Sequence, residues 1–435
     1  MRIAIYTLGC KVNQYETQAI EAELARRGHT LVDFRERADA YIINTCTVTA
    51  VSDGKCRAVI HRAQQHDPAP VVAVCGCYAQ TDPQAVAAMG VDLVAGSAGR
   101  MKFLDDLEAI AAARAGGDGE PQPLVTTGNI MAQRTFEELP AGGLAGRTRA
   151  MLKVEDGCVN FCSYCIIPYA RGPVRSLPLD KAVEEAKRLA AEGYRELVLT
   201  GIEISSWGHD LKNGLGLIDL TEALCAAAPG LRVRLGSLEP RTITADFCRR
   251  AAALPNLCPH FHLSMQSGCD TVLARMNRKY DSARYYESVR SLREYFDRPG
   301  ITTDMIVGFP GETEEEFRQS LDFIRKCAFS AMHIFPYSRR PGTPADKMPG
   351  QLSRAEKKER AQRAAAVAAE MEQTWLEGWV GATLPVLFEE EKDGAWQGHA
   401  PNYTLVRAQG ESLHNCLRQV RVTAAGEGCL LGELV

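Results

Sequence analysis

The stretch Gly157-Cys158-Val159-Asn160-Phe161-Cys162-Ser163-Tyr164-Cys165 places three cysteines in a C-x3-C-x2-C pattern, directly after the apolar run Met151–Val154. Three thiolates spaced this closely can each bind one corner of a [4Fe–4S] cluster, and without a fourth cysteine nearby one iron lacks a protein ligand. An open iron can bind a substrate or cofactor, so the loop indicates chemistry. The alternative is a structural zinc loop, which normally needs four ligands in C-x2-C pairs.

This loop resembles that of the radical S-adenosylmethionine enzymes, which prefer an aromatic residue before the third cysteine, as Tyr164 is here. The resemblance implies that the open iron at the Cys158, Cys162 and Cys165 cluster holds the amino and carboxylate groups of S-adenosylmethionine. One electron from the cluster would then cleave the sulfonium and release a 5′-deoxyadenosyl radical.

Length and composition bound the remaining possibilities. A chain of 435 residues with 46% hydrophobic content predicts several domains, each with a sizeable core. The net charge of −4 counts against a broadly basic nucleic-acid-binding protein but leaves room for a local basic groove. The segment Met1–Ile5 shows no signal peptide, and no apolar run approaches the ~20 residues that span a bilayer. We therefore expect a cytoplasmic protein with no membrane contact.

Fifteen cysteines are many for such a chain, and we expect them to be reduced and to serve metals or catalysis rather than disulfides. Cys225, Cys248 and Cys327 lie in helical patterns and are predicted to be small buried hydrophobic residues.

The N-terminal part of the chain alternates short apolar runs with helical segments, which predicts a small doubly wound parallel sheet. The expected strands are Ile3–Thr7, Ala40–Ile43, Val71–Val74 and Val91–Val94, and the helices include Glu16–Arg27 and Asp53–Gln65.

Three of these strands are followed by a cysteine: Cys10, Cys46 and Cys77. Because ligands gather at the carboxyl ends of parallel strands, the three thiols are expected to converge and to form a second open cluster site. The alternative is three unrelated buried thiols. Cys75 is equally within reach, but it ends an apolar run, and we expect it to belong to the buried strand. Cys77 is expected on a loop beyond the sheet edge, after a sharp turn at Gly76.

The middle of the chain predicts a linker and then a larger α/β domain. Residues rich in Ala, Gly and Pro form the linker, with one strand at Pro123–Thr126. Six βα units follow and predict a partial TIM-like barrel with its functional face at the strand C-termini. The expected strands are Met151–Val154, Glu196–Leu199, Arg232–Leu235, His260–Leu263, Thr302–Val307 and Ala331–Phe335.

A long helix from about Ser353 to Trp375 follows, with a capping box at Ser353 and Glu356 and with Gly378 beyond its end. The remainder predicts a small β-barrel with strands at Thr383–Phe388, Tyr403–Val406 and Leu417–Val422. Its charged residues are mostly acidic, which weakens the electrostatic case for RNA binding there, although Trp396 or Tyr403 could offer aromatic contacts.

Together these parts resemble the radical S-adenosylmethionine methylthiotransferase family over the whole chain. The matching segments are Thr7–Gln14, Asn44–Thr49, Gly76–Gln80, Asp156–Cys158, Gln266–Gly268, Ile306–Glu312 and Tyr337–Ala345. The resemblance implies an N-terminal methylthiotransferase domain with an auxiliary cluster at residues 1–112 and a linker at 113–145. It also implies a radical barrel with the following helix at 146–374 and a TRAM domain, an OB-like RNA-binding barrel, at 375–435. The fold class is therefore expected to be α/β with a C-terminal β-barrel.

The opening Thr7-Leu8-Gly9-Cys10-Lys11-Val12-Asn13-Gln14 is most similar to the branch that modifies threonylcarbamoyl-adenosine at tRNA position 37. That resemblance implies two [4Fe–4S] clusters and two S-adenosylmethionine molecules per turnover. One would methylate sulfur held at the Cys10, Cys46 and Cys77 cluster. The other, at the Cys158, Cys162 and Cys165 cluster, would yield the radical that takes hydrogen from C2 of the adenine. A reducing electron donor such as flavodoxin or ferredoxin is implied as a partner, beside the tRNA.

Two other functions stay open. One is the same chemistry on isopentenyl-adenosine tRNA or on a ribosomal-protein aspartate. The other belongs to a different class: a nucleic-acid-binding or redox-sensing protein whose clusters are not catalytic.

The resemblance also implies site residues beyond the cysteines. Cofactor binding is assigned to Tyr164, Gly201, Glu203, Glu239, Gln266, Gly308 and Glu312, and substrate binding to Arg171, Arg175, Tyr337 and Arg340. By position alone, Glu203 and Glu239 are equally well explained as exposed loop carboxylates, Glu312 as part of a helix cap, and the two arginines after the cysteine loop as solvated side chains.

Overall fold

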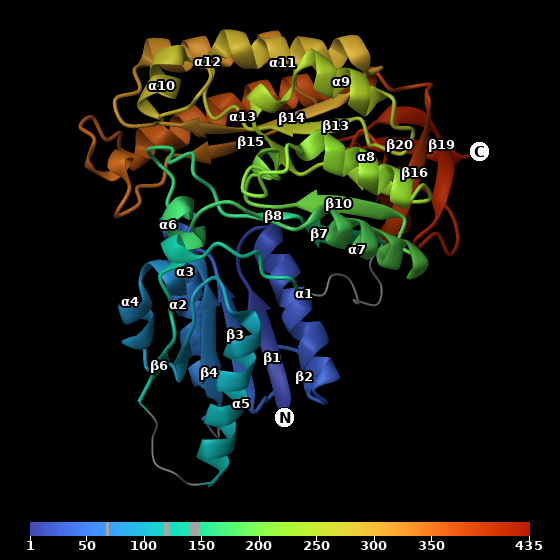
Figure 1. The fold of residues 1–435 in the computed structure, drawn as a ribbon. Helices are drawn as coiled ribbons and strands as arrows, with labels where there is room; N and C mark the ends of the chain where they lie inside the picture. Colours follow the sequence, from blue (N-terminus) through green and yellow to red (C-terminus); the bar gives the residue numbers. More distant parts are fainter. Residues whose placement is uncertain (67–68, 117–121, 140–147) are drawn as a thin grey trace. The chain divides into compact units, whose positions relative to one another are not determined.

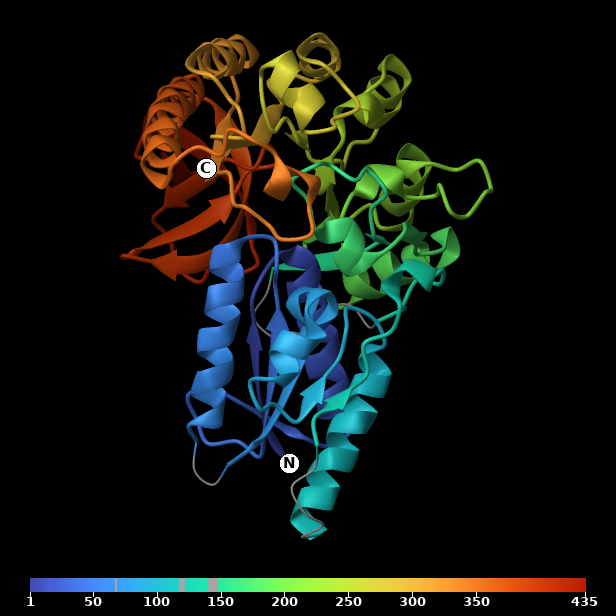
Figure 2. The same cartoon turned by 90° about the vertical axis from the view of Figure 1, so that its left-hand side faces the viewer.

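The computed structural model describes residues 1–66, 69–116, 122–139 and 148–435 of the chain (Figures 1 and 2). Its contacts divide the chain into two compact units. One comprises Met1–Leu144, Glu155–Leu177 and Ser338–Thr343, and the other Ala145–Val154, Pro178–Tyr337 and Pro344–Val435. The cysteine loop after Val154 therefore packs within the N-terminal unit, although it interrupts the sequence of the second unit.

The first unit is built on a six-stranded parallel sheet in the order β2-β1-β3-β4-β5-β6. Its strands are β1 (Arg2–Thr7), β2 (Thr30–Val32), β3 (Ala40–Thr45), β4 (Val71–Gly76), β5 (Leu93–Val94) and β6 (Leu124–Val125). The four strands expected before the linker are confirmed. The sequence did not predict β2, because its three residues are largely exposed and carry no run of buried apolar side chains.

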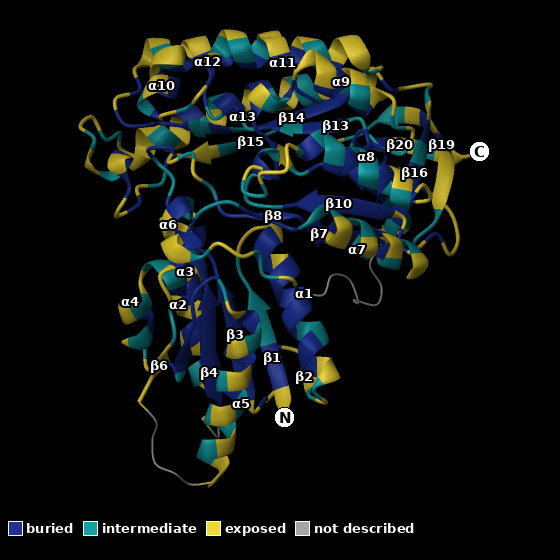
Figure 3. Ribbon diagram, viewed as in Figure 1, coloured by how far each residue is buried: buried dark blue, intermediate teal, exposed yellow. Residues whose placement is uncertain are grey.

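Helices cover both faces of this sheet, as a doubly wound fold requires. The α1 (Lys11–Arg26) and α5 (Arg100–Gly116) helices pack on one face, where Ile42 of β3 points. The α2 (Ala50–Gln64) and α4 (Pro83–Ala87) helices pack on the other, against Tyr41 and Ile43. Both β3 and β4 are buried along their whole length (Figure 3).

Two local expectations are corrected in this unit, and one is confirmed. The α1 helix begins at Lys11 rather than Glu16, because Cys10 is its N-cap. The α5 helix continues into the predicted linker as far as Gly116, and the strand predicted there joins the sheet as β6. The remaining Gly- and Pro-rich linker stretches, 117–121 and 140–143, lie outside the described residues.

The second unit contains the partial barrel. Its parallel strands form two sheets, in the orders β11-β10-β7 and β12-β13-β14-β15. They are β7 (Arg149–Lys153), β10 (Glu196–Thr200), β11 (Arg232–Arg234), β12 (Ser237–Leu238), β13 (His260–Leu263), β14 (Gly300–Val307) and β15 (Ala331–Pro336). Gly236 separates β11 from β12, and a Cβ there would lie 2.6 Å from the Leu199 carbonyl oxygen. The expected six βα units are thus present, with one strand broken in two.

Helices follow the barrel strands (Figure 1). They are α7 (Leu179–Ala191), α8 (Leu217–Ala227), α9 (Ala245–Ala252), α10 (Asp270–Arg275), α11 (Ser282–Tyr295) and α12 (Glu314–Cys327). Cys225, Cys248 and Cys327 are buried on these helices, as predicted.

The C-terminal part of this unit begins with α13 (Arg354–Glu377), whose N-cap Ser353 forms the expected capping box with Glu356. Five strands then close a small barrel in the order β16-β17-β18-β20-β19. They are β16 (Thr383–Lys392), β17 (Ala395–His399), β18 (Leu405–Ala408), β19 (Leu417–Ala425) and β20 (Leu430–Leu434). Among the described helices, none is both long and apolar enough to cross a membrane.

A buried polar network joins this small barrel to Glu196 of β10 and to the two arginines of β11. The Glu196 carboxylate accepts hydrogen bonds from Arg234, at 2.7 and 3.0 Å, and from Arg232, at 2.6 Å. Arg234 also donates to the Pro401 carbonyl at 2.7 Å. The Tyr403 ring is stacked against His260 and His399, at 4.6 and 4.7 Å between ring centroids. Tyr403 is therefore engaged within the protein and is not open for base stacking.

Candidate functional site

The N-terminal cysteines stand where three neighbouring strands end. Cys10 caps α1 beyond β1, Cys46 directly follows β3, and Cys77 begins the short helix α3 (Cys77–Thr81) beyond β4. Cys77 is thus buried at a helix start rather than on a loop, because Gly76, with φ of +98°, turns the strand directly into the helix. Cys75 lies inside β4 and is fully buried, as expected.

Asn13 ties these strand ends together. Its amide nitrogen donates to the carbonyls of Leu8, at 2.8 Å, and Thr45, at 2.9 Å, which immediately precede the loops of Cys10 and Cys46. The two loops are packed closely, since a Cβ on Gly9 would lie 2.9 Å from the Cys46 Cβ. Asn13 therefore fixes the first two cysteine loops relative to each other.

Arg171 brings the third cysteine into the same network. Its guanidinium donates to the Cys77 sulfur at 3.2 Å and to the Asn13 side-chain oxygen at 2.7 Å. It also forms an ion pair with Glu16, and Arg100 donates to the same carboxylate at 2.7 Å. Arg171, Arg100 and Glu16 are all essentially inaccessible to solvent.

The electrostatics of the three thiols reflect this proximity. Burial raises the pKa of Cys77 to about 12; the Arg171 cation opposes this rise, and negative charge on Cys10 or Cys46 adds to it. Burial also raises the pKa of Cys46, and Cys10 contributes to that rise. Each thiolate thus disfavours the next, so binding all three as thiolates requires a positively charged group such as iron, in addition to Arg171.

The C-x3-C-x2-C loop is closed at its base by two short antiparallel strands, β8 (Glu155–Asp156) and β9 (Arg175–Ser176). The Cys158 amide donates to the Gly172 carbonyl at 3.0 Å, and the Cys165 amide donates to Cys162 at 2.9 Å. Gly157 has φ of +93°, and a Cβ there would lie 2.1 Å from the Pro173 carbonyl oxygen. The backbone of this loop is therefore narrowly defined.

Both arginines that follow this loop are buried. Arg171 ends α6 (Ile167–Arg171), and Arg175 pairs with Asp156 at 3.2 Å and donates to the carbonyls of Arg171 and Pro173. The interpretation of these residues as solvated arginines is wrong, because each meets a buried carboxylate instead. Tyr164, between the second and third cysteines, is partly buried.

Three thiols at the ends of neighbouring strands are a donor set that an iron–sulfur cluster can use, because each thiolate of a cluster binds its own iron. Among the described residues, no group of three or more His, Cys, Asp or Glu side chains is arranged to hold one metal ion. The donor set of three thiols beside a buried guanidinium suits the anionic cluster.

On the second unit, Glu203 and Glu239 follow the C-terminal ends of β10 and β12. Glu203 accepts from Ser206, and the Glu239 amide donates to Ser205 at 2.9 Å. Burial raises the pKa of Glu203, and the charge of Glu239 raises it further. Neither is an exposed loop carboxylate, since Glu239 is buried and Glu203 is partly so. The Glu239 carboxylate also accepts hydrogen bonds from the Arg241 guanidinium, at 2.9 and 3.0 Å, so its charge is already paired with a cation. Gly201 directly follows the same β10 strand.

Gln266, Gly308 and Glu312 lie at the ends of the next strands. Gln266 adopts φ of +68° and bridges to Met305 of β14. The Glu312 carboxylate accepts from the Gly308 amide at 2.7 Å and from Arg360 at 2.6 Å. Its second oxygen has no hydrogen-bond partner among the described residues. Helix α12 is capped by Thr313 and Glu316, so the interpretation of Glu312 as a cap is wrong.

The two remaining predicted residues, Tyr337 and Arg340, belong to different units. Tyr337 is buried, with its ring against Phe309 at 5.5 Å between centroids. Arg340 belongs to the first unit, where it pairs with Asp53 at 2.6 Å and donates to the hydroxyl of Thr47, the residue after Cys46.

Sequence reasoning missed Asn13, Glu16, Arg100 and Asp53. Asn13 lies in the opening motif Thr7–Gln14, and its place in that motif is the sequence feature that could have indicated its role. The others are ordinary helical charges until the fold buries them.

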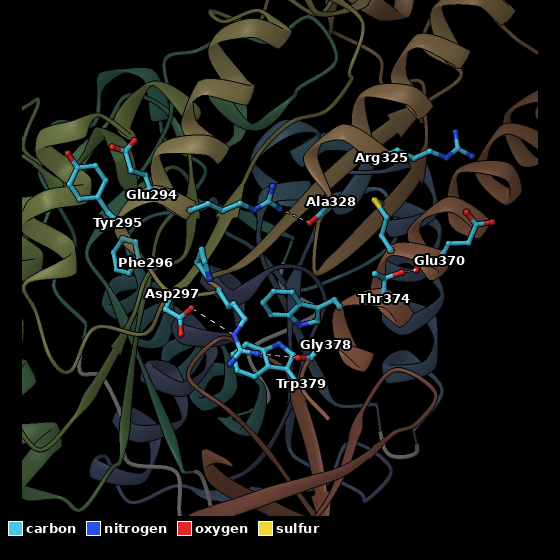
Figure 4. A pocket seen from close by; sticks show the side chains of 15 residues that line it. Glu294, Tyr295, Phe296, Asp297, Arg325, Ala328, Glu370, Thr374, Gly378 and Trp379 are labelled. Carbon is cyan, nitrogen blue, oxygen red and sulfur yellow. Dashed lines mark hydrogen bonds and ion pairs between the residues drawn. The ribbon is translucent and has the colours of Figure 1, made fainter. Parts of the chain in front are cut away.

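A cavity of the second unit lies at the start of β14, at the opposite end of the barrel strands from Gly308 and Glu312. It has a volume of about 1000 Å³ and lies among the ends of α11 and α13 and the segment preceding β14 (Figure 4). Arg298 stacks over Trp379 within it, at 3.8 Å from the ring centroid. Because active sites of TIM-like barrels form at the strand C-termini, this cavity is not where the cofactor residues gather.

Comparisons with known proteins agree with this arrangement. The family described as "Radical SAM superfamily" matches residues 152–324, and "Uncharacterized protein family UPF0004" matches residues 2–96. A Bacillus subtilis protein named threonylcarbamoyladenosine tRNA methylthiotransferase MtaB is 38% identical over 100% of this chain and 96% of its own length. An Aquifex aeolicus protein of the same name is 36% identical over 90% of this chain and 93% of its own.

A Symbiobacterium thermophilum protein named tRNA-2-methylthio-N(6)-dimethylallyladenosine synthase is 34% identical over 100% of this chain and 94% of its own length. Among solved structures, the radical S-adenosylmethionine methyltransferase TsrM from Kitasatospora setae superimposes with a TM-score of 0.58 at 18% identity, covering 79% of this chain and 75% of that one. The structural likeness supports the fold, and the sequence likeness supports the family: this chain belongs to the radical S-adenosylmethionine methylthiotransferase family.

Proposed function

We propose that this chain converts N6-threonylcarbamoyladenosine at position 37 of tRNA to its 2-methylthio derivative. The observation that carries the proposal is similarity to four relatives named for that reaction, which are 33–38% identical over 82–100% of this chain. Four relatives named for dimethylallyladenosine are 32–34% identical, and the opening motif around Cys10 supports threonylcarbamoyl-adenosine as the substrate.

Two [4Fe–4S] clusters are part of the proposal. Cys158, Cys162 and Cys165 would hold one, and Cys10, Cys46 and Cys77 the other, each with one iron open. When bound, one cluster with S-adenosylmethionine would supply the radical that an inert aromatic C–H requires, and the other would hold the sulfur that a second S-adenosylmethionine methylates. The residues around them position and desolvate the reacting groups.

The remaining roles follow from placement. Glu203 and Glu239 would bind the S-adenosylmethionine ammonium, and the unpartnered oxygen of Glu312 would accept a hydrogen bond from the same ligand. Tyr164, Gly201, Gln266 and Gly308 would line its site. Tyr337 and Arg340 would bind the tRNA. Arg340 lies near the N-terminal cluster site, because its side chain donates to Thr47, the residue after Cys46. A flavodoxin- or ferredoxin-like protein would supply electrons in the cytoplasm, where thiols stay reduced.

Mass spectrometry of tRNA nucleosides from a deletion strain tests the function. Loss of the 2-methylthio form with accumulation of threonylcarbamoyl-adenosine is the expected result. Loss of the methylthio form of isopentenyl-adenosine would instead assign the chain to the other branch, and unchanged tRNA nucleosides would overturn both.

Iron analysis after anaerobic reconstitution tests the cluster count. Two clusters should give about eight irons per chain. Replacement of Cys162 with Ala should abolish S-adenosylmethionine cleavage, whereas Cys46→Ala should keep some cleavage and stop methylthiolation. A stable content near four irons would contradict the two-cluster count, and methylthiolated product from Cys46→Ala would contradict the division of roles.

A further inference from the structure

We propose that Arg171 positions the three ligand loops of the N-terminal cluster and raises the reduction potential of that cluster. The inference rests on the proposed second cluster at Cys10, Cys46 and Cys77. It concerns a residue of the other cysteine loop, since Arg171 follows Cys165 on helix α6.

The contact with sulfur is direct. The Arg171 Nε–H donates to the Cys77 Sγ at 3.2 Å, with both groups buried. Hydrogen bonds to cluster sulfurs and the net charge around a cluster are among the factors that set its potential. A cation and an N–H donor at a ligand sulfur stabilise the reduced cluster, which carries one more negative charge, so both effects raise the potential.

The other two loops are reached through one side chain. Arg171 donates to the Asn13 side-chain oxygen at 2.7 Å, while the Asn13 amide donates to the carbonyls of Leu8 and Thr45. These carbonyls precede the Cys10 and Cys46 loops. One guanidinium thus contacts the third ligand directly and orients the residue that fixes the first two.

Burial makes the position of Arg171 well defined. Glu16 pairs with Arg171 and with Arg100, so the carboxylate and both guanidiniums hold one another in a region without solvent. Arg100 donates to Glu16 and to the Gly96 carbonyl, but none of its hydrogen bonds goes to sulfur. Of these two arginines, Arg171 alone faces a cysteine ligand.

The test uses the full chain with Cys158, Cys162 and Cys165 replaced by Ala, so that only the N-terminal cluster forms. Iron content and the reduction potential, from an EPR-monitored titration, are measured in this parent and in three variants: Arg171→Met, Arg171→Lys and Arg175→Met. Arg175 is the matched control, because it is a buried arginine of the same segment whose contacts within the described residues are with the Asp156 carboxylate and the carbonyls of Arg171 and Pro173.

Arg171→Met should disfavour reduction at least tenfold, which is about 59 mV for a one-electron couple. Arg171→Lys keeps the charge but not the guanidinium geometry, and it should shift the potential in the same direction by less. Arg175→Met should shift it least. If Arg171→Met binds no iron, the reduction potential of Arg171→Lys is compared with that of the parent instead.

An unchanged potential in the iron-loaded Arg171 variants, or an equal shift in the Arg175 control, would overturn the role of Arg171 and leave the cluster proposal intact. A parent that binds no iron would overturn the second cluster itself.

Discussion

Two buried networks in this molecule share one arrangement, a glutamate between two arginines, and differ in what else the arginines face. In the first unit, Glu16 pairs with Arg100 and Arg171. In the second, Glu196 pairs with Arg232 and Arg234. Glu16 and Glu196 are almost completely buried.

The two networks differ in the acceptors that the arginine N–H groups contact besides the glutamate. Arg171 directs its remaining donors to the Cys77 sulfur and to Asn13, whereas Arg234 directs them to the carbonyls of Ala400 and Pro401 in the C-terminal part of its unit. The ion pairs by themselves do not distinguish the two networks, because each holds a buried glutamate between two arginines. The chemical identity of the additional acceptor, a cluster-ligand candidate or a backbone carbonyl, distinguishes a network beside a reaction from one that joins two parts of a fold.

The largest contrast is expected between two buried cysteines, one beside each network. Cys77→Ala should remove one cluster's worth of iron and all methylthiolated product. Cys258→Ala, which removes a buried thiol near Arg234, should keep both iron and product. Iron and sulfide assays with tRNA nucleoside analysis measure this. Full iron content in Cys77→Ala would show that the cluster ligands are chosen wrongly.

The next contrast concerns the two glutamates. Replacing Glu196 with Gln leaves Arg232 and Arg234 buried without their carboxylate, and we expect a loss of unfolding free energy on the order of 3–5 kcal/mol. Iron content per folded chain should not change. Glu16→Gln should lose stability on a similar scale and also lose iron or shift the potential, because it releases Arg171. Anaerobic denaturant titrations with iron analysis compare them, and equal iron loss in both variants would erase the distinction.

Acid should weaken the second network in a defined range. Burial raises the pKa of Glu196, but Arg234, Arg232 and Arg149 outweigh it and lower that pKa from its ordinary value of 4.5 to about 2. The carboxylate therefore stabilises the fold fully above pH ~4.5, and this contribution, on the order of 3 kcal/mol, is lost as the pH falls toward 2. Unfolding free energies of the natural chain and Glu196→Gln should converge over this range; curves that stay parallel would contradict the assignment.

The sequence predicted the elements of both units well because their strands are apolar runs with a clear period. It predicted that Cys10, Cys46 and Cys77 follow strand ends, and it placed Cys75 inside β4. It missed short or edge strands such as β2, whose side chains are too exposed to form a pattern.

Neither arginine network could be predicted from the sequence. Glu16 and Arg171 are separated by 155 positions, and each looks like an ordinary surface charge on its own helix. Their burial follows from the packing of the Glu155–Leu177 segment within the first unit, which local sequence patterns do not specify. The sequence indicates Arg171 only through its position after the cysteines, and it does not show that this side chain contacts the Cys77 sulfur, Asn13 and Glu16.

The smallest expected effect sharpens the choice between the two neighbouring cysteines of the first unit. Cys75 pairs with Asn44 in the β3–β4 ladder, and its side chain belongs to the core formed with α1 and α5. A thiol in such a place packs as a small hydrophobic group, so Cys75→Ala should lower the unfolding free energy by only about 1 kcal/mol. Iron content and product should stay complete, in contrast to Cys77→Ala, because the Cys77 sulfur beyond the turn at Gly76 is the one that Arg171 contacts. Loss of iron in Cys75→Ala at nearly unchanged stability would show that a sulfur inside the sheet reaches the cluster, and that the network around Arg171 serves the fold alone.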